Sequence, residues 1–182
     1  MGLTVITPAT ATIVTLAEAK LILRVLDASF DDLLTAHIAA AQAQVEGVMG
    51  RCLAPQTWRL TLDAFSDAIR LPKSPVTSVT VRYYDLAGSL RTADPALYTL
   101  DLVSDPQWIV LNADESWPDT LDAVNAVQID FDAGFPDLTS NAAIAARNAI
   151  IAMVGCWFED GAIGTIPPGA RTILFPYTDH GF

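Results

Sequence analysis

The stretch from Ser29 to Gly50 places the strongest constraint on what this chain can fold into. Ser29 is a candidate N-terminal cap of a helix, and Gly50 can adopt the left-handed conformation that ends one. Between them, apolar residues recur at steps of three and four, the spacing that aligns side chains on one face of an α-helix. These residues are Phe30, Leu34, Ile38, Ala41, Val45 and Met49. The pattern predicts a long helix with one buried face, around which the rest of the chain packs.

Further helices are predicted before and after this stretch. The sequence TLAE at 15–18 is a capping box, in which a Thr hydroxyl and a Glu carboxylate satisfy each other's free amide groups, and it begins a short helix. Thr139 or Ser140 can cap a long helix that ends before Gly161. Residues 167–176 have room for a last short helix. The apolar positions expected in the long helix include Ile144, Ile151, Val154 and Phe158.

The segment between these helices alternates apolar and polar residues, which is the pattern of half-buried β-strands. Asp85 to Gly88 is typical of a hairpin turn. The connections are too short for crossover helices, so the sheet is expected to be mainly antiparallel. Strands are expected at 57–63, 78–83, 98–102, 109–111 and 127–131.

We therefore predict a single α+β domain of 182 residues. It is a bundle of three to four helices with an antiparallel β-sheet insertion between the second and third helices. The helical part is expected at 15–53 and 139–178, and the β-rich insertion at 54–135. An extended N-terminal arm takes residues 1–14, and a C-terminal tail takes residues 176–182.

The charge pattern argues against direct binding of nucleic acid. The chain has 21 Asp and Glu against 10 Lys and Arg, a formal net charge of −11, and no cluster of basic residues. Phosphate contacts depend on such clusters. An acidic surface favours solubility and, as a second interpretation, repels DNA that passes it.

Residues 141–158 are almost wholly apolar, but their centre is polar. Arg147 and Asn148 lie there, which favours a buried helix over a membrane span. The N-terminus lacks the basic and apolar segments of a signal peptide. We therefore expect no membrane partner and a protein that is made in a cytoplasm.

The sequence has no G-x-S-x-G, no H-E-x-x-H, no Gly-rich phosphate loop and no Walker lysine. Cys156 and His37 could form a thiol site, but Cys156 lies in an apolar helix, where burial weakens a nucleophile. Asp130 and Asp132 share one face of a strand, and a catalytic or cation site there would need further ligands. Cys52 and Cys156 lack the spacing of metal ligands. We predict no catalytic, cofactor or metal site, and therefore no enzyme.

The order of these elements resembles the head–tail connector, or adaptor, proteins of long-tailed bacteriophages, a family that includes the adaptors of gene transfer agents. The resemblance covers nearly the whole chain from Leu16 to Tyr177. It is carried by LAEAKLILRV (16–25), residues 31–53, QTWRLTLDAF (56–65), residues 69–85, SWPD (116–119), AVQIDFDAGF (126–135) and residues 153–161.

The resemblance implies a structural protein of the virion neck, assembled in the bacterial cytoplasm. Members of the family form a ring, commonly of twelve subunits, on the portal protein of a DNA-filled head. The ring extends the DNA channel without sequence-specific binding, and it is the platform for a tail-side neck protein, a stopper or tail terminator. Two alternatives are that the chain is itself a stopper or tail terminator, or a small thiol or carboxylate enzyme.

Two sets of contact residues are expected within this reading. Phe175 and Tyr177 flank Pro176 near the end of the chain, so they either pack on the domain or anchor it to a partner, and we favour the partner. By the resemblance, the portal-docking candidates are Arg171, Ile173, Leu174, Phe175, Pro176 and Tyr177. Small residues on a second face of the long helix would let a neighbouring subunit approach closely, and these are Ala36, Ala39, Ala40 and Ala43.

Overall fold

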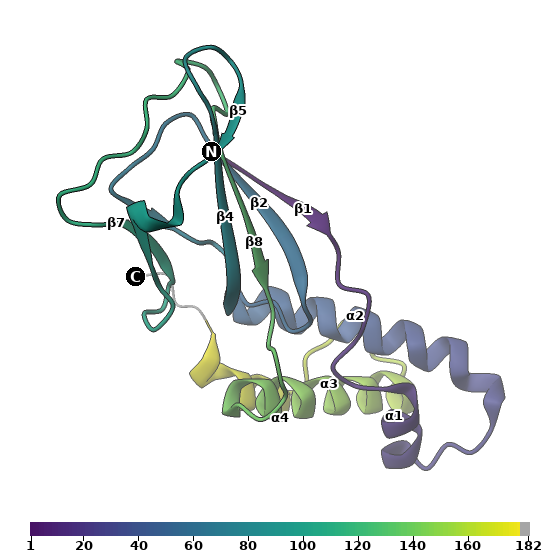
Figure 1. The fold of residues 1–182 in the computed structure, drawn as a ribbon. Helices are drawn as coiled ribbons and strands as arrows, with labels where there is room; N and C mark the ends of the chain where they lie inside the picture. Colours follow the sequence, from purple (N-terminus) through teal and green to yellow (C-terminus); the bar gives the residue numbers. More distant parts are fainter. Residues whose placement is uncertain (179–182) are drawn as a thin grey trace. The chain divides into compact units, whose positions relative to one another are not determined.

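The computed structural model describes residues 1–178, and its contacts divide the chain into two compact units (Figure 1). The sheet unit contains residues 1–9 and 55–134, and the helical unit contains residues 10–54 and the chain from 135 onward. Helices and antiparallel strands are both present, which confirms the predicted α+β class. Residues 179–182 of the predicted tail lie outside the described residues.

The helical unit has four α-helices and two short 3₁₀ turns within the described residues. The helices are α1 (Leu16–Leu23), α2 (Asp31–Met49), α3 (Asn141–Asp160) and α4 (Pro168–Leu174). The turns are η1 (Ala28–Phe30) and η3 (Phe175–Tyr177). All the predicted helices are therefore present, each within a few residues of its expected ends.

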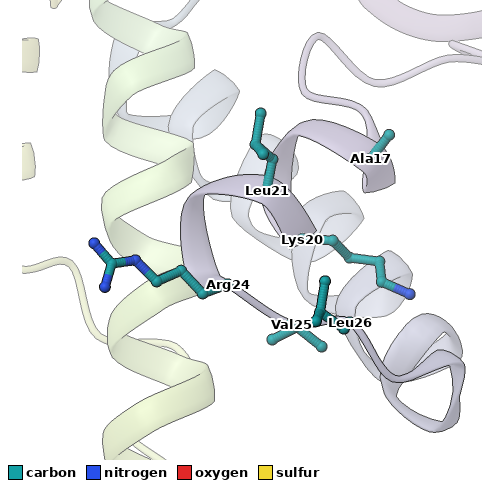
Figure 2. A pocket seen from close by; sticks show the side chains of 6 residues that line it. All are labelled: Ala17, Lys20, Leu21, Arg24, Val25 and Leu26. Atoms are coloured by element: carbon teal, nitrogen blue, oxygen red, sulfur yellow. The ribbon is translucent and has the colours of Figure 1, made fainter.

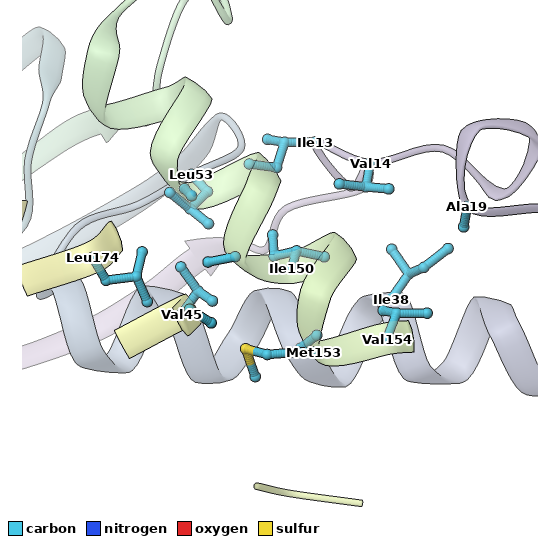
Figure 3. Packing of buried hydrophobic residues seen from close by; sticks show 14 of the residues in the cluster. Ile13, Val14, Ala19, Ile38, Val45, Leu53, Ile150, Met153, Val154 and Leu174 are labelled. Carbon is cyan, nitrogen blue, oxygen red and sulfur yellow. The ribbon is translucent and has the colours of Figure 1, made fainter. Parts of the chain in front are cut away.

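Helix α2 buries the face that its sequence predicts, apart from its first residue. Leu34, Ile38, Ala41, Val45 and Met49 are buried in the core of the helical unit, part of which Figure 3 shows. Gly50 ends the helix with φ of 68°, as expected.

Two predictions at the start of this helix are wrong. Ser29 is not the cap, because Asp27 accepts a hydrogen bond from the Ser29 amide (2.9 Å) and begins the 3₁₀ turn η1 one turn earlier. The narrower turn takes Phe30 off the buried face, and its side chain stays 40% exposed. The ring of Phe30 packs edge-on against Phe158 instead, with centroids 5.3 Å apart.

Helix α3 packs against α2 through an alanine-rich face. Ser140 accepts a hydrogen bond from the Ala143 amide (3.2 Å), and Gly161 ends the helix with φ of 66°. Ile144 is 44% exposed, contrary to the prediction, because the small side chains take the contact face and let the two helices approach closely. The buried residues are Ala143, Ala145, Ala146, Ala149, Ile150, Met153, Val154 and Trp157.

By length and composition alone, α3 could also cross a membrane. Its buried face is part of the core in Figure 3, and Arg147 at its centre forms an ion pair with Glu18. These contacts favour the core helix that the sequence predicts.

The sheet unit holds two antiparallel sheets. The five-stranded sheet has the order β1-β2-β8-β4-β5, and its strands are β1 (Gly2–Thr7), β2 (Gln56–Leu62), β4 (Val76–Tyr84), β5 (Leu90–Thr92) and β8 (Val127–Ala133). The three-stranded sheet has the order β3-β7-β6, with strands β3 (Ala68–Arg70), β6 (Tyr98–Asp101) and β7 (Trp108–Leu111).

The segment expected as an arm has structure in both units. Residues 2–7 form the edge strand β1, which pairs with β2. Ile13 and Val14 are buried in the helical core, and the Ile13 amide donates a hydrogen bond to the side-chain oxygen of Gln42 on α2 (2.8 Å).

Candidate functional site

The paired aspartates on β8 are used to hold the five-stranded sheet together. Asp130 accepts two hydrogen bonds from the guanidinium of Arg59 on β2 (2.6 and 2.8 Å), and Arg82 on β4 lies 3.1 Å away. Asp132 accepts hydrogen bonds from Thr57 (2.6 Å) and Ser78 (2.7 Å), and these bonds lower the pKa of its carboxyl group. Both carboxylates therefore join neighbouring strands, as cross-strand pairs in a sheet commonly do.

Cys156 and His37, the candidate thiol site, each contact a different side chain in the structure. His37 is buried on α2, where its ring packs edge-on against Trp157 with centroids 5.8 Å apart. The thiol of Cys156 contacts the Asp160 carboxylate at 3.7 Å, one turn along α3. Within residues 1–178, the Nδ1 atom of His37 has no hydrogen-bond partner, and no group of three or more His, Cys, Asp or Glu residues could hold a metal ion.

The residues expected to dock on the portal divide between the core and the surface of the helical unit. Leu174 is fully buried in the core, and Tyr177 packs partly against it. Ile173 and Phe175 point outward, with exposed fractions of 40% and 66%. Arg171 and Pro176 are also exposed. The segment from α4 to η3 thus holds itself to the helical unit through some side chains and presents others to solvent.

The small residues of α2 lie on the face turned away from the helical core. Ala36, Ala39, Ala40 and Ala43 are all exposed. Gly47 continues this face, and a side chain added there would meet no atom within 4 Å. The outer face of α2 therefore allows close approach of another backbone.

A third surface was not anticipated from the sequence. Helix α1 and the turn after it leave Leu21, Ile22 and Leu26 exposed at 80%, 48% and 97%. Figure 2 shows the pocket beside them, which has a volume of about 420 Å³. It is lined by Ala17, Lys20, Leu21, Arg24, Val25 and Leu26. The available signal was the run LILRVL, which has more apolar residues than one face of a short helix can bury.

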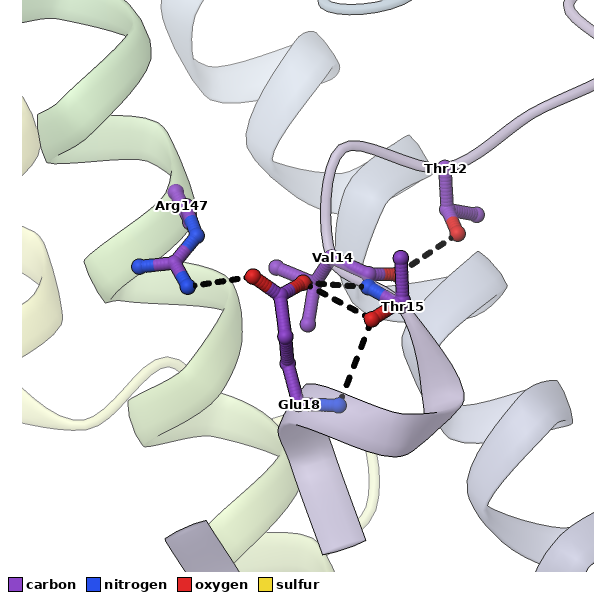
Figure 4. Close-up of polar contacts among 5 residues, drawn as sticks. All are labelled: Thr12, Val14, Thr15, Glu18 and Arg147. Atoms are coloured by element: carbon purple, nitrogen blue, oxygen red, sulfur yellow. Dashed lines mark hydrogen bonds and ion pairs between the residues drawn. The ribbon is translucent and has the colours of Figure 1, made fainter. Parts of the chain in front are cut away.

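Helix α1 is fixed in place by a polar cluster at its N-terminus (Figure 4). The Glu18 carboxylate accepts hydrogen bonds from the amide and hydroxyl of Thr15 (both 2.9 Å) and from the guanidinium of Arg147 on α3 (2.6 Å). The Thr15 bonds and the Arg147 contact lower the pKa of Glu18 from 4.5 to about 2. The predicted capping box is therefore confirmed, and Arg147 ties it to the core helix.

These observations define a class of protein. The aspartate pair and the Glu18 carboxylate serve caps and cross-strand bonds, whereas large apolar side chains remain exposed on α1 and after α4. Exposed apolar patches of this kind are typical of a subunit that associates with other chains.

Comparison with solved structures finds similar chains in one kind of particle. The chain is similar to a chain in the neck of an empty gene transfer agent (GTA) particle computed with C6 symmetry, at 26% sequence identity and a TM-score of 0.75. That match covers 98% of this chain and 95% of the other, and a chain in the virion of a native GTA particle gives the same values. A chain in the neck of a native GTA particle computed with C12 symmetry matches at 27% identity, a TM-score of 0.68 and the same coverage.

No protein-family model matches the chain, and no curated protein does. The resemblance to the neck proteins of phages and gene transfer agents is nevertheless confirmed, because these structures match over nearly the whole chain. They support a structural, non-enzymatic role in the neck of a phage-like particle.

Proposed function

We propose that this protein is the head–tail connector, or adaptor, of a phage or gene transfer agent particle. It forms a ring on the portal protein, extends the DNA channel and provides the platform for the tail-side neck protein. The observation that carries the proposal is the match, over 98% of the chain, to chains from GTA necks that were computed with C6 and C12 symmetry. A twelve-subunit ring agrees with both symmetries.

The surface properties of the chain support this role. A formal net charge of −11 per chain gives an acidic ring that does not bind DNA tightly, which suits a channel through which DNA moves. The exposed small residues of α2, Ala36, Ala39, Ala40 and Ala43, are our candidates for contact between subunits.

The portal contact is proposed at the outward side chains of the last helical segment, Arg171, Ile173, Phe175 and Pro176. Leu174 and Tyr177 support this segment from the core side. Deleting the whole segment is a poor test, because Ala170 and Leu174 are buried and their loss would damage the helical core. Serine at both Ile173 and Phe175 removes the apolar contact and keeps the core.

Two measurements test the function. Electron microscopy of particles that carry a labelled chain should place the label between the portal and the tail-side neck proteins. A label at the tail end of the neck would instead identify a stopper or tail terminator. In binding to portal-containing heads, the Ile173→Ser/Phe175→Ser variant should be weaker than the intact chain, and Ile144→Ser on α3 is the matched exposed control. Equal binding by both variants would refute the proposed anchor.

A further inference from the structure

The turn between α3 and α4 presents one isoleucine to solvent on a fixed backbone. Ile163 is 65% exposed. The hydroxyl of Thr165 donates to the Ala162 carbonyl (2.6 Å), and the Thr165 carbonyl accepts a bond from the Trp157 indole (2.8 Å). The side-chain Nε2 of Gln44 on α2 donates to the Gly164 carbonyl (2.8 Å). The turn is thus held to α2 and α3, whereas the isoleucine that it carries has little packing of its own.

The charges beside Ile163 are negative. Glu159 and Asp160 end α3 immediately before the turn, and both are exposed. Within the described residues, the Glu159 carboxylate has no hydrogen-bond or ion-pair partner. The surface is therefore a protruding apolar side chain next to an uncompensated acidic group.

The pocket on α1 has the opposite character. Its floor is apolar, and Leu21 and Leu26 at its edge are among the most exposed apolar side chains of the helical unit. Two cationic residues also line it. Lys20 is already paired with Asp31, but the guanidinium of Arg24 has no partner in the described part of the chain. An exposed apolar pocket beside a free cation suits an apolar side chain flanked by a carboxylate.

A closed ring needs two different complementary surfaces on every subunit, because each copy contacts its two neighbours in a head-to-tail manner. We propose that Ile163 of one copy enters the α1 pocket of the next copy, with Glu159 facing Arg24 across the contact. The partner is thus a second copy of this chain. This inference rests on the proposed ring, and it names the side chains that join its subunits in addition to the small face of α2.

Cross-linking tests the contact directly. Chains with Leu26→Cys and chains with Ile163→Cys carry different tags and are mixed, both in a Cys156→Ser background; Cys52 is buried and can stay. A short bis-maleimide should join the two kinds of chain. Val124, which is 78% exposed in the sheet unit, provides the control as Val124→Cys. No Leu26–Ile163 product, or an equal yield with the control, would overturn the proposal.

Self-association gives an independent measurement by sedimentation over a concentration series. Ile163→Ser should weaken association on the order of tenfold, as expected for a central apolar anchor, and the control Ile144→Ser should not. Arg24→Glu and Glu159→Arg should each weaken association, and the two together should restore it. A double variant as weak as the singles, or an intact chain that stays monomeric, would refute the contact.

Cross-linking of the Leu26→Cys and Ile163→Cys chains can be repeated in assembled particles. It then tests the contact between copies and the connector role separately. A labelled chain in the neck that gives no Leu26–Ile163 product refutes the contact alone. Cross-linked chains that are absent from the neck refute the connector role and leave the contact standing.

Discussion

Replacing Glu18 by Gln tests how α1, and with it the pocket, is held to the helical unit. The pKa of Glu18 falls from 4.5 to about 2 in the folded chain, which at roughly 1.36 kcal/mol per pKa unit sets an upper limit of about 3.4 kcal/mol. The side chain is 38% exposed, so solvent screening reduces this value. Glutamine can still complete the capping box, so the expected loss is the charge-assisted part of the bonds to Thr15 and Arg147. We therefore expect Glu18→Gln to lower the free energy of unfolding by about 1–1.5 kcal/mol at pH 7.

The effect has a definite pH dependence. Because the folded-state pKa is lowered, the stabilisation by Glu18 is fully present above the unfolded-state value of 4.5 and is lost as the pH falls towards 2. Other carboxylates also have lowered pKa values, among them Asp85 and Asp132. The informative quantity is therefore the difference in unfolding free energy between the intact chain and the variant, which should shrink between pH 5 and pH 2.

Urea unfolding, followed by circular dichroism, measures this difference. Arg147→Met and the double variant complete a cycle that isolates the coupling between the two side chains. Hydrogen exchange adds a local measurement: amides of α1 should exchange on the order of tenfold faster in Glu18→Gln, while those of α2 stay unchanged. A variant difference that persists at pH 2, or α1 exchange equal to that of the intact chain, would show that the polar cluster does not hold α1.

Three other changes have expected outcomes. Ala43→Glu on the exposed face of α2 should change the unfolding free energy by less than about 0.5 kcal/mol but abolish ring formation in sedimentation; unfolding of the isolated chain would assign this face to the core instead. Asp130→Ala leaves Arg59 and Arg82 without their shared carboxylate and should cost about 2 kcal/mol in urea unfolding, whereas no loss would mean that the pairs are screened. Met153→Ala in the fully buried core should cost roughly 2–5 kcal/mol in the same assay, and a smaller cost would mean that the helices close over the cavity.

The sequence was most informative where one local pattern determines the structure. The buried face of α2, its end at Gly50 and the capping box of α1 follow from spacing and residue type, and the structure has all three. The prediction failed at Phe30 because a 3₁₀ turn, capped by Asp27, precedes the helix and shifts the residues before it. Strands β3 and β5 have three residues each, too few for alternation to be detected.

The ion pairs between strands could not be predicted from the sequence, for a different physical reason. The sequence placed Asp130 and Asp132 on one face of a strand without showing their partners. In the structure β8 lies between β2 and β4, and this order brings Arg59 and Arg82 to Asp130 from both sides. Hydrophobic periodicity contains no information about strand order. In the same way, the run LILRVL predicts apolar contact without showing that Leu21 and Leu26 remain outside the core of the single chain.

In so acidic a chain, a cationic side chain without a partner indicates where another copy can bind. Copies of a chain with a formal net charge of −11 repel one another, so subunits can associate only where local charge is reversed or where little charge is present. The outer face of α2 carries little charge, because it is made of alanines. The α1 pocket has reversed charge, because Lys20 and Arg24 line it. Lys20 and Arg147 are used within the helical unit to hold α1 in place, which leaves Arg24 available at the pocket. The contacts that position α1 are therefore also a condition for the surface that we propose joins one copy to the next.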